Sequence, residues 1–140
     1  MAKGYEQHQQ RSRALSMFGK DLTRRAHSRC ELCEAGGQSL QNSELPPVPA
    51  EPAFERCLFV CDQCSRELEG APIANPERWR CLNNTVWSEI PAVQAAAVLI
   101  LRRLAGATPW AGELLDQVYL SDAAKFLLGE TVPEVEETEQ

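Results

Sequence analysis

The sequence contains Cys30-Glu31-Leu32-Cys33 and, after the 27 residues from 34 to 60, Cys61-Asp62-Gln63-Cys64. Two residues between paired cysteines allow one tight turn to direct both sulfur atoms at the same ion, and structural zinc takes four such soft ligands at tetrahedral corners. The segment between the pairs is long enough for a strand, a loop and a returning strand, so both turns can meet at one metal. The sequence therefore predicts one structural Zn²⁺ held by Cys30, Cys33, Cys61 and Cys64.

Other ligand sets stay open at this point because the chain has six cysteines and two histidines. His27 precedes Cys30 by three residues and Cys57 precedes Cys61 by four, and neither spacing matches a zinc knuckle. We expect His27 to end a helix and Cys57 to lie in a strand core. Arg29 and Arg66 stand beside ligands, where they either offset part of the negative charge of four thiolates on Zn²⁺ or lie solvated at the surface.

A closed site of four thiolates favours a structural role over catalysis. Catalytic zinc keeps one position open for water and usually has histidine or carboxylate ligands. Dithiol redox chemistry needs a single CxxC pair at the start of a helix, in an electropositive setting, and does not require a matching second pair. Zinc-containing HNH nucleases place a histidine between their cysteine pairs, and the segment 34–60 contains none. We therefore predict a protein that is not an enzyme and has no catalytic residues.

Length and composition favour one compact unit. A chain of 140 residues suffices for a zinc module with a helical extension but hardly for two independent domains. The start is polar and lacks the apolar run of a secretory signal, and the most apolar stretch, 92–101, is about half as long as a membrane span. We expect a cytoplasmic protein without membrane association, and in that reducing compartment cysteines bind metal more often than they form disulfides.

Hydrophobic spacing and start signals predict the order of the elements. Apolar residues three or four apart predict one basic helix over 9–28, and short strands around a proline-rich loop form a zinc ribbon over 29–70. Helix start signals at Asn75-Pro76, Ser88, Thr108-Pro109 and Ser121-Asp122 predict several helices over 71–130.

The predicted fold class is α+β: a small four-cysteine zinc ribbon of short antiparallel strands, preceded by one helix and followed by several packed helices. We expect residues 1–8 to be a flexible lead-in and residues 131–140 to be an acidic disordered tail.

The net charge of −6 is unevenly distributed, since basic residues gather before residue 30 and glutamates gather after residue 129. A basic segment can bind an anionic partner, although charge runs are more often solvated faces. We therefore predict a zinc-stabilised binding or regulatory module for an unknown macromolecule, with a protein favoured as the partner. The alternative is nucleic-acid binding through the basic N-terminal helix.

One further stretch runs from Pro76 to Gln94 and reads Pro-Glu-Arg-Trp-Arg-Cys-Leu-Asn-Asn-Thr-Val-Trp-Ser-Glu-Ile-Pro-Ala-Val-Gln. Together with Arg29-Cys-Glu-Leu-Cys33 and Val60-Cys-Asp-Gln-Cys64, it resembles the N-terminal part of the PhnA family, a bacterial family named after a gene in a phosphonate-uptake operon. The resemblance covers about Thr23 to Gly129.

The resemblance implies that the cysteine knuckles form a zinc ribbon. Longer members of the family continue past an acidic linker into a small β-barrel domain, whereas this chain stops in what looks like the linker, so functions of the barrel are not carried over. The family name has also attracted the label phosphonoacetate hydrolase, which belongs to a larger metallohydrolase. Nothing that resembles the histidine and aspartate metal ligands of that enzyme occurs in this sequence.

The segment from Trp79 to Pro91 supports two interpretations. Its aromatic and polar side chains can bind a ligand or peptide; they are Trp79, Arg80, Asn83, Asn84, Trp87 and Glu89. We favour the alternative that Trp79, Cys81, Leu82 and Trp87 pack the zinc module against the helices, because tryptophan and cysteine are predominantly buried residue types. Cys81 is accordingly expected to be a core thiol.

Overall fold

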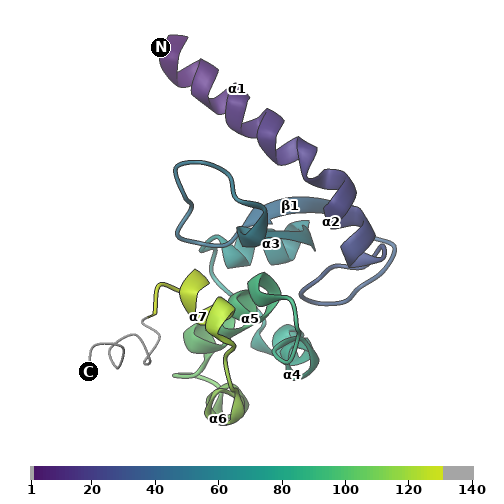
Figure 1. Ribbon diagram of the computed structural model, residues 1–140. Coiled ribbons are helices and arrows are strands. Elements are labelled where there is room, and N and C mark those ends of the chain that lie inside the picture. Colours follow the sequence, from purple (N-terminus) through teal and green to yellow (C-terminus); the bar gives the residue numbers. More distant parts are fainter. Residues whose placement is uncertain (1, 131–140) are drawn as a thin grey trace, which may run out of the picture.

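The computed structural model describes residues 2–130, and side chains from residue 9 onward. Met1 and the expected acidic tail at 131–140 lie outside the described residues. Within them the fold is α+β, as predicted, with a two-stranded antiparallel sheet that has helices before and after it (Figure 1). The helices of this part are α1 (Ala2–Met17), α2 (Gly19–Ala26), α3 (Asp62–Leu68), α4 (Leu82–Thr85), α5 (Pro91–Leu104), α6 (Pro109–Gln117) and α7 (Asp122–Leu127), with short 3-10 helices η1 (Phe54–Arg56) and η2 (Pro76–Cys81).

The N-terminal region differs from the single helix expected over 9–28. It forms two helices, and α1 already begins at Ala2, so residues 2–8 are helical where a flexible lead-in was expected. The break falls at Phe18, because Gly19 is a poor helix former and the Phe18 ring packs edge-on against Phe54 at 5.5 Å. Helix α2 is anchored in the protein body through buried Leu22, whereas α1 projects from it (Figure 1).

The sheet consists of β1 (Leu40–Glu44) and β2 (Cys57–Cys61), paired so that Leu40 lies opposite Cys61. The continuous apolar run of β2 is typical of a strand covered on both sides, and its residues are buried except for the partly exposed Phe59. Helices α2, α3 and α5 contact this strand. The register places Cys61 at the end of the hairpin, where the second cysteine pair begins.

Helix α3 follows β2 directly, although the sequence analysis treated this stretch as part of the ribbon. The second CxxC pair therefore spans a strand-to-helix junction. The sequence does carry helix signals here: Asp62 and Arg66 form an i,i+4 ion pair at 3.0 Å, and Gly70, at φ +121°, ends the segment. The helix buries Cys64 and Leu68 on one face.

The start signals of the later helices act largely as predicted. The side-chain oxygens of Asn75 and Ser121 accept backbone amides at 3.2 and 3.1 Å and so cap η2 and α7. Ser88 is different, because α5 begins only at Pro91 and the Ser88 hydroxyl accepts the amide of Ile90 in the preceding turn. Helix α5 is the central helix of residues 71–130 and contacts both α6 and α7.

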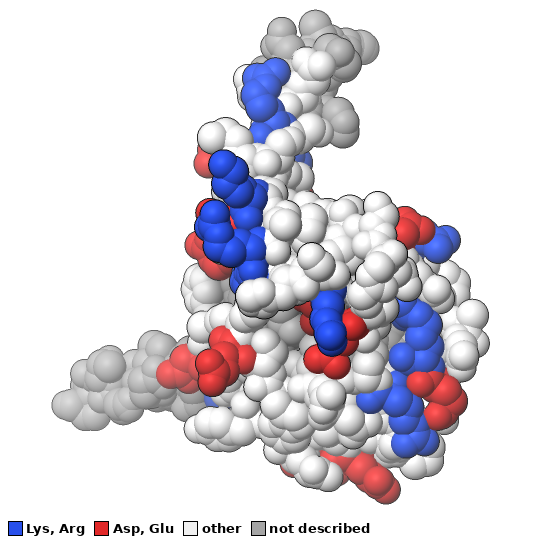
Figure 2. Space-filling model, turned by 90° about the vertical axis from the view of Figure 1, so that its right-hand side faces the viewer, with Lys and Arg blue, Asp and Glu red and all other residues white. Residues whose placement is uncertain are grey.

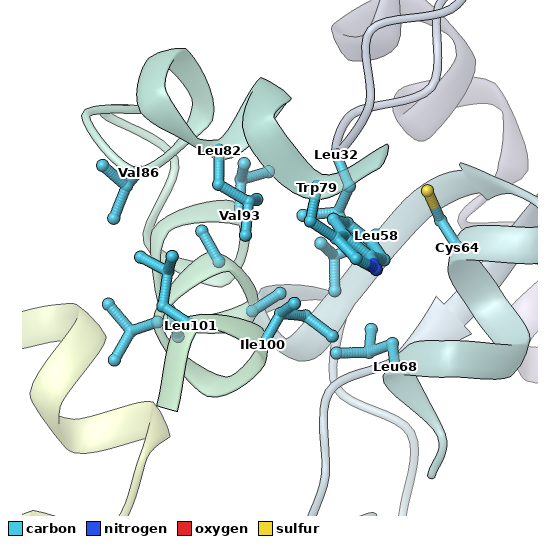
Figure 3. Packing of buried hydrophobic residues seen from close by; sticks show 14 of the residues in the cluster. Leu32, Leu58, Cys64, Leu68, Trp79, Leu82, Val86, Val93, Ile100 and Leu101 are labelled. Atoms are coloured by element: carbon cyan, nitrogen blue, oxygen red, sulfur yellow. The ribbon is translucent and has the colours of Figure 1, made fainter. Parts of the chain in front are cut away.

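Trp79 joins the half that contains the sheet and the two cysteine pairs (29–70) to the helical half (71–130). It is fully buried, and Figure 3 shows its ring beside Leu58, with Leu68 of α3 and Ile100 of α5 nearby. Its indole Nε1 donates to Glu67 Oε1 at 2.6 Å. The packing interpretation of this tryptophan is therefore confirmed.

For Trp87 the packing interpretation is wrong, because this side chain is 49% exposed. Its neighbour Val86 takes the buried position just after α4 ends at Thr85, so the next residue faces outward.

In the described part of the chain, no helix combines the length and the apolar character that crossing a membrane requires.

These two tryptophans offer a matched test of the core. We expect Trp79→Ala to lower the free energy of unfolding by about 3–5 kcal/mol, because it removes a buried ring and the indole hydrogen bond to Glu67 Oε1. Trp87→Ala should change it by less than about 1 kcal/mol. Urea denaturation of metal-loaded protein measures both, and equal losses would contradict the assignment of Trp79 to the core.

Candidate metal centre

The fold brings together the four cysteines of the two CxxC pairs. Their Sγ atoms all lie within 4.8 Å of one another, and those of Cys33 and Cys61 are 3.9 Å apart. A tetrahedral ion with metal–sulfur bonds of about 2.3 Å requires sulfur atoms about 3.8 Å apart. Cys30, Cys33, Cys61 and Cys64 therefore form a cluster that can hold one metal ion with little rearrangement.

The first cysteine pair is shaped by a tight turn. Glu34 adopts a left-handed conformation, and its amide donates to the carbonyl of Cys30 at 2.8 Å. The amide of Cys33 points back at Cys30 Sγ at 3.4 Å, as in a zinc knuckle. The amide of Glu31 donates to the carbonyl of Phe59 and so fastens this turn to β2.

The second pair approaches from the opposite side. Cys61 ends β2 and Cys64 lies in the first turn of α3, so the strand and helix directions fix both sulfur atoms. The amide of Cys61 donates to Cys30 Sγ at 3.4 Å. The two pairs are therefore joined by a backbone-to-sulfur hydrogen bond in addition to any metal.

The arginine that faces the cluster is Arg78, not Arg29 or Arg66. Arg29 is exposed, and Arg66 is an exposed partner of Asp62. Arg78 Nη2 lies 3.1 Å from Cys64 Sγ and 3.7 Å from Cys61 Sγ, and its guanidinium stacks on Trp79 at 5.0 Å. The positive charge that offsets the thiolates therefore comes from Arg78 and not from the two arginines expected from the sequence.

Arg78 stays cationic in this setting. Burial by itself disfavours its charge, but the hydrogen bond to Cys64 and the surrounding thiolates raise the pKa of Arg78 above its ordinary value. Its Nη1 lies 4.0 Å from Glu67 Oε1 and has no closer partner among the described residues. Glu67 is itself buried and also accepts from Trp79. The cluster is thus connected to the core by a chain of charged and aromatic groups.

In the metal-free cluster the sulfur atoms compete for protons. The Cys64 thiol donates to Cys30, which lowers the pKa of Cys30 to about 4 and raises that of Cys64 far above the usual range. Burial, with added repulsion from Cys30 and Cys61, raises the pKa of Cys33 to about 11. At neutral pH at least Cys33 and Cys64 therefore hold protons that a metal ion has to displace.

The remaining candidate ligands stand apart from the cluster. His27 is an exposed residue in a left-handed conformation at the C-cap of α2, as expected of a helix-end residue. Cys57 is fully buried in β2, and its thiol donates to the carbonyl of Ala53, which agrees with a strand core. Cys81 packs against the core while partly exposed, and burial raises its pKa to about 11.

Fold and site together define a small α+β protein with a four-cysteine cluster able to hold a metal ion. No protein-family model matches the chain, and comparison with curated proteins and with solved structures returned no match either.

Metal affinity should rise with pH. Loading displaces the protons of at least Cys33 and Cys64, so each unit of increase should strengthen apparent affinity by about a hundredfold while both thiols stay protonated in the metal-free chain. Competition with a chromophoric chelator at pH 6, 7 and 8 measures the slope, and Cys57→Ser should leave it unchanged. Affinity independent of pH would contradict the proton competition described here.

Proposed function

We propose that this chain is a zinc-stabilised binding or regulatory module without catalytic activity, whose partner is a protein. The observation that carries the proposal is the cluster itself, in which four sulfur atoms lie within 4.8 Å of one another, close to the spacing that one tetrahedral ion requires. Zinc is the metal that such a site suits best, because four thiolates from two knuckles are its characteristic structural ligand set.

The bound ion would connect segments that are distant in sequence. The first knuckle also contacts the helical half, because the buried Thr85 hydroxyl donates to the carbonyl of Leu32 at 2.8 Å. It contacts α2 through the largely buried ion pair of Arg25 with Glu31 at 2.7 Å. Removing the ion would leave these contacts to hold together a cluster of crowded, partly protonated sulfur atoms.

Zinc should therefore be required for stability. We expect one zinc ion per chain by elemental analysis, and a thermal unfolding midpoint that falls by more than about 10 °C after chelation. Cys64→Ser should reproduce the loss, because Cys64 is a fully buried ligand, whereas Cys81→Ser should retain the metal. An unchanged midpoint in the metal-free protein would defeat the structural role of zinc.

The absence of catalysis is part of the proposal. A metal ion with four thiolate ligands offers no open position for water or substrate, which argues against the hydrolase label attached to the PhnA family. The resemblance to that family stays a prediction. Release of phosphate from phosphonoacetate by the zinc-loaded protein would contradict the non-catalytic interpretation.

A cleft beside the first knuckle supports protein binding. It has a volume of about 360 Å³ and lies between the first knuckle and the α4–α5 connection. Exposed Trp87 lines it together with Asn84, His27 and Arg29. An exposed tryptophan next to polar groups is a typical anchor in protein interfaces.

The structure weakens the nucleic-acid alternative, although it does retain a basic face. Figure 2 shows Lys and Arg side chains along the projecting N-terminal helices. However, Arg11 donates to the carboxylate of Glu44 and to two loop carbonyls, and Arg25 is bound to Glu31 and the carbonyl of Cys57. These two arginines serve the fold, which leaves fewer cations for phosphate groups.

Capture experiments distinguish the two partner classes. Zinc-loaded protein immobilised in cell extract should retain a protein partner, and Trp87→Ala should lower that retention about tenfold, a typical loss for an interface anchor. Phe126→Ala, which removes an exposed ring on α7, should have no effect.

The same samples are titrated with labelled DNA and RNA. Binding at low salt that falls steeply as salt rises and is unaffected by Trp87→Ala would instead favour the nucleic-acid alternative.

A further inference from the structure

We propose that Cys33 is the thiolate through which soft carbon electrophiles attack the metal centre, and that Arg78 directs the attack there by covering the second cysteine pair. The inference rests on the proposed zinc site. It assigns the four ligands different roles: three hold the ion in a protected position, and one is open to modification.

The second pair is covered by a partly buried cation, Arg78, whose side chain is 22% exposed. Arg78 Nη2 donates to Cys64 Sγ at 3.1 Å and lies 3.7 Å from Cys61 Sγ, and both cysteines are at most 2% exposed. A charged N–H donor draws electron density from a thiolate and occupies the direction from which an electrophile would approach. Cys61 and Cys64 should therefore be poor nucleophiles as long as Arg78 is in place.

Cys30 is protected in a different way. Its sulfur accepts the backbone amides of Cys33 and Cys61, each at 3.4 Å, and its side chain is 1% exposed. It therefore combines burial with two fixed donors that belong to the two knuckles. Neither donor can move away without opening the cluster.

Cys33 is the exception among the four ligands. It is the only one of them that is partly exposed, and in the described part of the chain it receives no hydrogen bond from Arg78. The contact that its sulfur makes is with a second sulfur atom, Cys61 Sγ at 3.9 Å, and not with a cationic donor. Reactivity of a thiolate follows its exposure and electron density, so Cys33 should react before the other three.

The proposed step is an alkylation. With iodoacetamide as the electrophile, a sulfur electron pair of the Cys33 thiolate forms a bond to the methylene carbon and the carbon–iodine bond breaks, releasing iodide. The product is a neutral thioether, which would be a far weaker ligand for zinc than the Cys33 thiolate. Modification at Cys33 should thus loosen the metal.

The experiment uses zinc-loaded full-length protein with limiting iodoacetamide. Zinc release is followed with a chromogenic indicator, and adducts are located by fragment-ion mass spectrometry. We expect Cys33 to carry the first adduct among the four ligands, with the same rate constant as zinc release. Adducts on Cys81, which is not a ligand, are scored separately because they should release no zinc.

Variants of Arg78 test the directing role. In Arg78→Gln we expect adducts on Cys61 and Cys64 to form about tenfold faster, the factor that corresponds to one hydrogen bond of about 1.4 kcal/mol. Arg78→Lys keeps the charge and should retain the selectivity, which covers the case in which the glutamine variant fails to fold. Arg80→Gln is the matched control, because Arg80 lies on the same 3-10 helix but is exposed and paired with Glu77.

The outcomes separate this inference from the proposed function. If the purified protein binds no zinc, the proposed function fails. If it binds one zinc ion per chain but the first adduct falls on Cys30, Cys61 or Cys64, or is spread equally over all four, the role of Cys33 is overturned. If Arg78→Gln and Arg78→Lys both react like the unaltered protein, the directing role of Arg78 is overturned.

Discussion

The fold depends on the crowding of four sulfur atoms within 4.8 Å of one another. Without a metal, this arrangement requires some thiols to keep their protons and to share them with neighbouring thiolates. A divalent cation would remove that conflict, since it could bind all four sulfurs as thiolates with little rearrangement. The first knuckle, the end of β2 and the start of α3 all meet at this cluster. Their relative positions consequently follow from one tetrahedron.

The structure also depends on a chain of electrostatic contacts that extends from the cysteine cluster into the core. Arg78 faces the thiolates, Glu67 lies behind it, and Trp79 donates to Glu67 while its ring stacks under the guanidinium. Buried charges of this kind are costly unless they are paired, and here the thiolates and Glu67 provide opposite charge on both sides of Arg78. Packing of the helical half and charge balance at the metal site therefore share residues. A substitution that alters the packing should therefore also alter the charge balance at the cysteine cluster, and the reverse should hold as well.

The parts of this structure that sequence predicted are those set by local spacing. These features depend only on residues a few positions apart in the sequence. They are the cysteine pairs, the continuous apolar run of β2 and capping residues such as Asn75 and Ser121. Arg78 could not be found in this way, because it lies 14 residues from Cys64 and reaches the cluster only through the tertiary fold. Trp87 was misassigned for a related reason: composition favours burial of tryptophan, but the register at the end of α4 decides which of Val86 and Trp87 faces the core.

The first knuckle belongs to both the metal centre and the cleft. Cys30 contributes a ligand and also lines the cleft, together with Glu31 and Glu34 from the same turn. Glu34 holds a left-handed backbone conformation that L-residues adopt at a cost, and the metal site over-determines this turn. Loss of the ion would free the turn to relax and would thereby change the wall of the cleft opposite Trp87. In the proposed function the shape of the binding surface would thus depend on metal occupancy, and the ion would influence binding without contacting the partner.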